Sequence, residues 1–199
     1  SYVEPSRSAT GELVFEMLTA ANLEITKSIA SYLYCAISSD TGSFQYASVN
    51  KRTYEILIAL TEAGINATQL CSMLYERKSL TQLYLEAEAI NSLKLYHDGK
   101  IATAHVTNEM LEKYNAKRSD TEALASLPRS IDGVMISAFF SELSNGDIRV
   151  NLRAQGDYDI EPVARFFGGG GHKKAAGCTL EGVDMEKAQN LVVGELIKL

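Results

Sequence analysis

The residues with the clearest chemical potential are four consecutive glycines followed by a histidine and two lysines. They form the string GGGGHKKAAG at residues 168–177. Glycines let neighbouring backbone N–H groups converge on an anion, because no Cβ blocks the approach and a positive φ costs little. Ala175 and Ala176 could begin a short helix whose first amides would add to that field. The string therefore indicates a small-anion site. It is neither a Walker A loop nor a dinucleotide fingerprint, because Lys173 stands where each needs glycine.

The charge pattern around this string supports the same interpretation. The chain of 199 residues carries a net charge of −6, yet residues 162–180 contain no acid and do contain Arg165, His172, Lys173 and Lys174. This distribution excludes the broad basic face that binds duplex DNA and leaves room for a local anion pocket. The alternative is a flexible loop with solvated lysines. The flanking Phe166 and Phe167 make a linker the weaker interpretation.

A second set of polar residues lies just upstream on a predicted strand. Arg149, Asn151 and Arg153 alternate with apolar residues, so all three should point to the same face. The strand is expected to follow a hairpin turn at Asn145 and Gly146. An ordinary solvated strand face is one interpretation of Arg153.

The string DTGSF at residues 40–44 is a further candidate site. Asp-Thr-Gly-Ser also occurs in the catalytic loop of aspartic proteases, but those proteins are β-rich and the residues before Asp40 have helical periodicity. A second Asp-Thr-Gly is absent from the chain, although a homodimer could supply one. From the residues alone, an Asx turn at the end of a helix is the favoured interpretation.

The periodicity of apolar residues divides the chain into a helical part and a mixed part. Helices are expected to begin near Thr10, Ile25, Lys51, Asn66 and Ser79, and the last should reach about residue 93. Hairpins are expected over residues 94–106 and 133–154, followed by a helix from about residue 185. We therefore expect an α/β protein with a helical part at 1–78, a connecting helix at 79–94 and a compact α+β domain at 95–199.

Cysteine content and hydropathy indicate the compartment. Cys35, Cys71 and Cys178 are odd in number and widely spaced, which argues against a disulfide framework or a zinc knuckle. No apolar run approaches the roughly 20 residues of a membrane span. A cytoplasmic protein without a membrane partner is expected.

Together these motifs resemble a known family. The string at 168–177, preceded by Arg149-Val150-Asn151-Leu152-Arg153 and by Tyr158-Asp159-Ile160, is similar to the DHH-associated C-terminal domain. It is most similar to the nanoRNase/pAp-phosphatase branch of the DHH phosphoesterases, which also include RecJ-like nucleases. The resemblance implies that Arg153 and His172 contact phosphate, and that the amides of Gly169, Gly170 and Gly171 cradle it.

The same resemblance changes the interpretation of Asp40. The string DTGSF looks like the fourth motif of DHH enzymes, whose aspartate ligates a divalent metal. It thus implies a catalytic, metal-binding role for Asp40, with Mn²⁺ or Mg²⁺ as the cofactor, since a hard oxygen ligand suits either ion. Paired metals suit phosphoester hydrolysis because they generate hydroxide near neutral pH.

The family's other metal ligands are missing from this sequence. The Asp-His-His triplet and the early His-x-x-x-Asp-x-Asp segment are absent, and residues 2–13 resemble the segment that follows the triplet. The chain therefore resembles the C-terminal three-fifths of such an enzyme: the helical end of a parallel-sheet DHH domain and a smaller α+β substrate-binding domain. It starts at Ser1 without Met, which favours a fragment.

The expected parent activity is metal-dependent hydrolysis of short oligoribonucleotides, of 3′-phosphoadenosine 5′-phosphate (pAp), or of both. Linear dinucleotides remain open as substrates. The expected partners are short single-stranded RNA or small nucleotides, and a homodimer is compatible with the sequence. The alternative is a nucleotide- or phosphate-binding module without hydrolysis. This chain alone is expected to be inactive, because one aspartate cannot hold a two-metal site.

Overall fold

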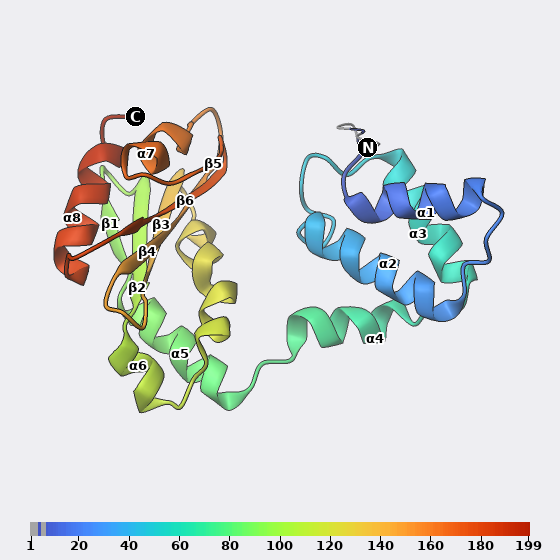
Figure 1. The fold of residues 1–199 in the computed structure, drawn as a ribbon, viewed down its shortest axis with the longest axis horizontal. Helices are drawn as coiled ribbons and strands as arrows, with labels where there is room; N and C mark the ends of the chain where they lie inside the picture. The colour runs from blue at the N-terminus through green and yellow to red at the C-terminus, as the bar shows by residue number, and fades with distance from the viewer. Residues whose placement is uncertain (1–3, 5–6) are drawn as a thin grey trace. The chain divides into compact units, whose positions relative to one another are not determined.

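The computed structural model describes residue 4 and residues 7–199 of the chain. The chain divides into two compact units, Ser1–Arg77 and Lys78–Leu199 (Figure 1). Of residues 2–13, which resemble the segment that follows the Asp-His-His triplet, residues 2, 3, 5 and 6 lie outside the described residues.

The described part of the N-terminal unit is helical, as its periodicity predicts. Its elements are α1 (Thr10–Ala20), α2 (Lys27–Asp40), α3 (Lys51–Glu62), α4 (Ala67–Cys71) and the π-helical turn η1 (Ser72–Glu76). Its core is formed by side chains such as Phe15, Ile37 and Leu60. Among the described residues, no single helix is long and apolar enough to cross a membrane. One sharply bent pair, α3 with the segment from α4 through η1, meets those criteria together by length and composition.

Two of the residues at which helices are expected to begin, Asn66 and Ser79, are N-caps in the structure, and a third, Thr10, is not. The Asn66 side chain accepts a hydrogen bond from the Gln69 N–H at 3.0 Å, and that of Ser79 accepts from Gln82 at 3.1 Å. Thr10 is the first helical residue of α1, and Ala9 at the N-cap position has no side chain that could cap the helix. The start of α1 is organised by a side chain inside the helix, because the Ser8 hydroxyl and N–H both donate to the Glu12 carboxylate.

The C-terminal unit has a mixed sheet covered by helices. Its helical elements are α5 (Leu80–Asn91), α6 (Asn108–Lys113), η2 (Arg118–Ser130, a 3₁₀ segment), α7 (Glu161–Phe166) and α8 (Met185–Leu196). Its strands are β1 (Lys94–Tyr96), β2 (Ile101–Val106), β3 (Ile136–Glu142), β4 (Ile148–Ala154), β5 (Gly170–His172) and β6 (Ala175–Leu180). The α+β architecture expected for this part of the chain is confirmed.

The strands described in this unit form one sheet of order β1-β2-β3-β4-β6-β5. Only β2 and β3 pair in parallel, and every other neighbouring pair is antiparallel. Both expected hairpins, β1–β2 and β3–β4, are present. The chain then passes through α7 and returns as the β5–β6 hairpin, so β5 is an edge strand.

Each face of the sheet has its own core. On one face α7 and α8 cover side chains that include Phe140, Val150 and Leu152. On the other face α5, α6 and η2 cover Phe139 and the inward side chains of β2 (Figure 1). Helix α5 contributes the fully buried Leu85 and Ala89 to this second core. Helix α5, which covers most of the predicted connecting helix at 79–94, therefore packs as part of the C-terminal unit.

Candidate functional site

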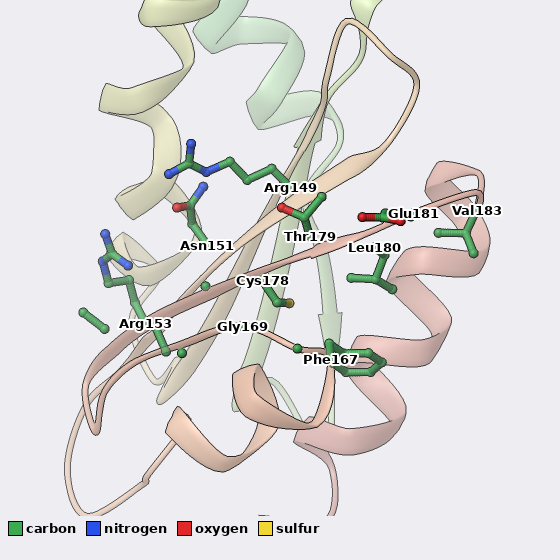
Figure 2. A pocket seen from close by; sticks show the side chains of 15 residues that line it. Arg149, Asn151, Arg153, Phe167, Gly169, Cys178, Thr179, Leu180, Glu181 and Val183 are labelled. Atoms are coloured by element: carbon green, nitrogen blue, oxygen red, sulfur yellow. The ribbon is translucent and has the colours of Figure 1, made fainter.

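A row of polar side chains runs along β4. Arg149, Asn151 and Arg153 extend to one side of this strand (Figure 2), while the alternating residues between them are buried under α7 and α8. This orientation is the one that the alternation in sequence predicts. On the opposite face, η2 contacts β3 and β4, and the surface of β6 next to this row lines an open hollow.

The neighbouring strand β6 provides a floor of small side chains. In the antiparallel register Arg149 lies opposite Thr179, Asn151 opposite Gly177, and Arg153 opposite Ala175. Long polar side chains on one strand beside short ones on the next leave a hollow of about 950 Å³. We call it the glycine-floored hollow.

The glycines bring the chain close to β6. A Cβ on Gly169 would lie 2.1 Å from the Gly177 carbonyl oxygen, and one on Gly177 would lie 2.9 Å from the Val150 oxygen. Any side chain at Gly169 would therefore require the backbone to move. Both glycines line the hollow. Glycine is thus needed at both positions because the backbone segments pack closely, which would not be the case in a flexible loop.

The structure corrects two details of the predicted anion loop. Ala175 and Ala176 do not begin a helix, because they pair with β4 and β5 as the first residues of β6. The Gly169 N–H donates to the Ala164 carbonyl at 2.8 Å and closes the end of α7. Since that amide already has an acceptor, it is not available to hold a phosphate.

The remaining predicted residues of the string form the edge strand. Gly170 lines the hollow, whereas Gly171 and His172 lie beyond its lining residues. Gly171 has φ of +148°, and a Cβ there would lie 2.5 Å from the Ala176 Cα, so only glycine fits. The His172 side chain is exposed at the end of β5.

The hairpin tip is tied to the body of the unit by one of the two lysines. Lys174 Nζ donates to the carbonyl oxygen of Tyr158 at 2.8 Å and also to that of Gly156. This lysine therefore holds the β5–β6 hairpin in place. The two backbone bonds that Ala154 and Ile160 donate to residues 174 and 173 add to the anchor.

The hollow combines cationic, aromatic and neutral walls. Among the described residues, no carboxylate forms an ion pair with Arg149, and Glu181 is the one acid that lines the hollow. Phe167 lies at the end of the hollow away from the arginines (Figure 2), and its ring meets that of the exposed Phe166 edge-on at 5.0 Å. Burial raises the pKa of the Cys178 thiol, which also lines the hollow, to about 11, so this thiol is uncharged at neutral pH.

Asp40 is the last residue of α2, in the N-terminal unit, and is exposed. No hydrogen bond from another described residue reaches its carboxylate, so the Asx turn expected from composition is not formed. Thr41 organises the turn instead, because its hydroxyl donates to the Ile37 oxygen at 2.6 Å and accepts from the Phe44 N–H at 3.1 Å. A carboxylate at a helix C-terminus is disfavoured by the helix dipole. The position of the Asp40 carboxylate at the end of α2 therefore does not stabilise the fold.

The backbone after Asp40 is strained. Gly42, Ser43 and Phe44 all have positive φ, at 56°, 57° and 65°. Two of the three carry side chains, for which this region costs on the order of 1 kcal/mol each. Packing of the Phe44 ring against the Tyr34 ring, with the ring centroids 5.9 Å apart, offsets part of that cost. Such strain is common where a loop must present a functional group.

The described residues do not assemble a metal centre. Within residues 4 and 7–199, no group of three His, Cys, Asp or Glu side chains could hold a metal ion. Asp40 belongs to the N-terminal unit, while Arg153, Gly169, Gly170, Gly171 and His172 belong to the C-terminal unit. The described residues thus do not supply the set of donors that the paired metals expected from the family resemblance would need.

Comparison with known proteins decides the family. Residues 98–198, half of the chain, match the DHHA1 domain. The chain belongs to the DHHA1 family. This match confirms the resemblance drawn from the glycine-histidine string and covers the sheet from β2 to β6 together with α8.

The relatives extend the similarity to the N-terminal unit. The chain is 27% identical over 191 residues to the bifunctional oligoribonuclease and PAP phosphatase NrnA of Thermus thermophilus. It is 30% identical over 181 residues to a probable protein of the same name from Streptococcus mutans. These matches cover 96% and 89% of this chain but 57% and 56% of the relatives, so the chain spans little more than half of their length.

A solved structure has the same fold. An exopolyphosphatase-related protein from Bacteroides fragilis superposes with a TM-score of 0.91 at 31% identity, over 98% of this chain and 58% of that protein.

Phe167, which lines the hollow, and Arg118, which lies outside its lining, are not predicted as site residues by the sequence. Phe167 flanks the glycine run, and an aromatic pair directly before such a run is a usable signal for an aromatic wall that stacks on a base. Arg118 lies in η2, a segment without clear periodicity, and nothing in the sequence connects it with β4.

Proposed function

We propose that the C-terminal unit is the nucleotide-binding part of a metal-dependent phosphoesterase. The proposed substrates of the parent enzyme are short oligoribonucleotides, pAp, or both. The observation that carries the proposal is the glycine-floored hollow, with two arginines and an asparagine over a floor of glycine and alanine. The names of the NrnA relatives support the same substrate class.

Each wall of the hollow has a feature that suits part of a nucleotide. The planar guanidinium groups of Arg149 and Arg153 match the geometry of phosphate oxygens, and the Asn151 amide adds donors. The floor at Gly177 lets a ligand approach the strand closely. Phe167 offers an aromatic surface for a base at the far end, and such stacking contributes about 1–3 kcal/mol per base. Because these groups converge on one hollow, a small nucleotide fits this surface better than a duplex.

His172 is proposed to contact a phosphate just outside the glycine-floored hollow. Its imidazole is exposed two residues beyond Gly170, which lines the hollow. A ligand that fills the hollow and extends along β5 would reach it. His172→Ala is then expected to weaken nucleotide binding by about 1–3 kcal/mol. Unchanged affinity by calorimetry would remove this residue from the site.

We propose that Asp40 supplies one carboxylate to a Mn²⁺ or Mg²⁺ site of the parent enzyme. Bound metal would supply hydroxide and neutralise charge on the phosphate. The exposed carboxylate at a helix C-terminus and the strained loop that follows support a functional role for Asp40. Since the described residues add no further ligands to it, no hydrolytic step follows from Asp40 alone. The proposal for this chain is therefore nucleotide binding without turnover.

Two measurements on the 199-residue chain test the proposal. Titration with pAp should show binding that falls at least about 10-fold in Arg153→Gln, because a charged hydrogen bond to phosphate is lost. Incubation with a five-nucleotide RNA and Mn²⁺ should release no mononucleotide. Absence of pAp binding would overturn the nucleotide-binding function, whereas robust release of mononucleotide would overturn the conclusion that the metal site is incomplete.

A further inference from the structure

The outer face of helix α5 is apolar. Its residues are exposed to solvent and occur along the whole helix: Leu80, Leu83, Tyr84, Ala87 and Ile90. Asn91, at the end of α5, is the one exposed residue of this helix outside that set. The exposed side of a surface helix is normally polar, so an apolar outer face indicates an interaction site. We call the five residues the α5 apolar face.

The opposite face of α5 already has its packing partner. Leu85 and Ala89 are fully buried and belong to the core on this side of the sheet. The residues between the two faces are partly buried and polar, namely Thr81, Gln82, Glu86 and Glu88. A helix that packs on one partner needs one apolar stripe, and α5 has two on opposite sides. The second stripe therefore indicates a second partner.

The charges beside the α5 apolar face are already paired within the C-terminal unit. Glu86 pairs with Lys78 at 2.6 Å, and Glu88 pairs with Lys113 at 2.7 Å. The helix itself contains no Lys or Arg. Helices that bind an acidic membrane surface carry cations beside their apolar face, which α5 does not. The charge pattern therefore favours a protein partner that brings an apolar surface of its own.

Tyr84 and the flanks of α5 are ordered by neighbouring side chains. The Tyr84 ring stacks on the Tyr114 ring with the centroids 5.3 Å apart, and the Tyr114 hydroxyl donates to the Glu88 carboxylate at 2.7 Å. Gln82 Nε2 donates to the Asp120 carboxylate at 3.0 Å and ties α5 to η2. A surface that is ordered before binding loses little conformational entropy when a partner docks. The α5 apolar face is thus presented by a helix that is already fixed.

The spacing of the apolar residues suits a second copy of the same face. Four of them follow one another at steps of three, four and three residues: Leu80, Leu83, Ala87 and Ile90. This is the spacing of the contact positions in paired helices. In an antiparallel pair with its two-fold axis level with residue 85, Leu80 of one copy meets Ile90 of the other. Leu83 then meets Ala87, so a large side chain lies opposite a small one on both sides of the axis.

The size of the α5 apolar face suits a weak dimer. Its four large side chains are between 47% and 63% exposed and present roughly 400 Å² of apolar surface, within the range of functional patches on monomeric proteins. Because homodimer interfaces are about 65% apolar, this patch corresponds to roughly 600 Å² per copy and roughly 1,200 Å² in total. That area is at the lower limit for a specific interface, so we expect dissociation in the micromolar range.

We propose that the α5 apolar face pairs with the same face of a second copy of this chain, in an antiparallel arrangement about a two-fold axis. None of its five residues lines the glycine-floored hollow, so the inference does not rest on nucleotide binding. Because α5 packs as part of the C-terminal unit, the dimer joins two of these units, each with its own hollow.

Sedimentation equilibrium of the full chain between about 1 µM and about 500 µM tests the pairing. We expect the mean mass to rise from monomer to dimer with a midpoint of about 10–100 µM. Leu83→Glu should stay monomeric over this range, because it places a carboxylate in an apolar interface near the axis. Leu191→Glu is the matched control and should dimerise like the wild type, since Leu191 is 43% exposed on α8, which covers the opposite face of the sheet.

A mixture of two charge variants guards against a folding artefact. Residue 83 lies two residues from the level of the axis, about 3 Å along a helix, so these positions in the two copies are close together. Leu83→Glu and Leu83→Lys should each be monomeric alone, and their equimolar mixture should recover a dimer.

Three results would each overturn the proposal. They are a wild-type chain that stays monomeric at about 500 µM, a Leu83→Glu chain that dimerises like the wild type, and a mixture of the charge variants that stays monomeric. The affinity of Leu83→Glu for pAp is a separate readout and should stay within about 2-fold of the wild type. Failure of the dimer therefore leaves the proposed nucleotide binding standing, and absence of pAp binding leaves the dimer standing.

Discussion

Thr179→Glu is a substitution that should separate ligand binding from fold stability. Thr179 is exposed on β6, lines the glycine-floored hollow and lies directly opposite Arg149. A glutamate there can pair with the arginine across the strands. Opposite charges in such a position stabilise a sheet by about 0.2–1 kcal/mol. The same carboxylate occupies the place that a phosphate would take.

The expected loss of affinity follows from the charge and its distance. At about 6 Å, two unit charges repel by about 3 kcal/mol with an effective dielectric constant near 20 and by about 0.7 kcal/mol in water. The hollow is open to solvent, so we expect a repulsion between these limits, about 1.5 kcal/mol. This repulsion corresponds to a dissociation constant about 10-fold larger. Loss of the Arg149 contact adds to this value.

The assay is calorimetric titration with pAp, together with urea unfolding of the same variants. Thr179→Gln is the control, because it has nearly the size of glutamate without its charge. Relative to that control, the glutamate variant should unfold at a slightly higher urea concentration and bind pAp about 10-fold more weakly. Equal affinities in the two variants would show that the phosphate does not lie beside Arg149, and the account of the hollow would be refuted.

Three further predictions concern stability and reactivity. Gly169→Ala should lower the free energy of unfolding by about 1–3 kcal/mol, because its Cβ would lie 2.1 Å from a backbone oxygen. Gly170→Ala is the control: it has open space around it and should change the free energy of unfolding by less than about 0.5 kcal/mol. Equal urea midpoints for the two variants would contradict the close packing of Gly169 against β6. Burial, with a smaller effect of Lys94, lowers the pKa of His105, so the unfolded chain binds more protons, and stability present above pH 6.5 should decrease as the pH falls below that value. His105→Gln should flatten this dependence in urea unfolding between pH 7.5 and 5.5, and an unchanged slope would exclude His105 as its source. Cys178, whose pKa burial raises to about 11, should react with a disulfide reagent at pH 8 much more slowly than an unfolded thiol, and rapid labelling at that position would contradict its burial.

The sequence was most informative where a side chain's direction depends on local periodicity. Alternation along residues 148–154 was enough to place Arg149, Asn151 and Arg153 on one face, because successive strand residues point to opposite sides. The helices of the first unit and both hairpins followed from similar local patterns. The family resemblance and the structure then agree on the α+β domain.

The glycine run shows where local reasoning was insufficient. Four glycines suggest flexibility, yet Gly169 and Gly171 are required by contacts with β6, a strand that comes later in the chain. This steric requirement could not be predicted, because contacts with another strand are not visible in the local sequence.

Arg118 and the loop after Asp40 could not have been placed from sequence. Arg118 donates to the Asn108 side chain and to the Glu142 backbone oxygen because η2 packs over the sheet, which no periodic pattern indicated. The left-handed backbone at Ser43 and Phe44 is unusual for residues with side chains and is stabilised by contacts of Thr41 and Tyr34. Both features depend on tertiary packing that overrides local preference.

The central claim is that the glycine-floored hollow on β4 and β6 binds a nucleotide through its phosphates. The most direct measurement is a titration of the ¹⁵N-labelled 199-residue chain with pAp, followed by NMR. The account predicts that the largest shifts occur at the backbone amides of residues 168–170 and 177–180 and at the guanidinium Nε–H groups of Arg149 and Arg153. Shifts confined to other parts of the chain, or no shifts at millimolar pAp, would contradict it.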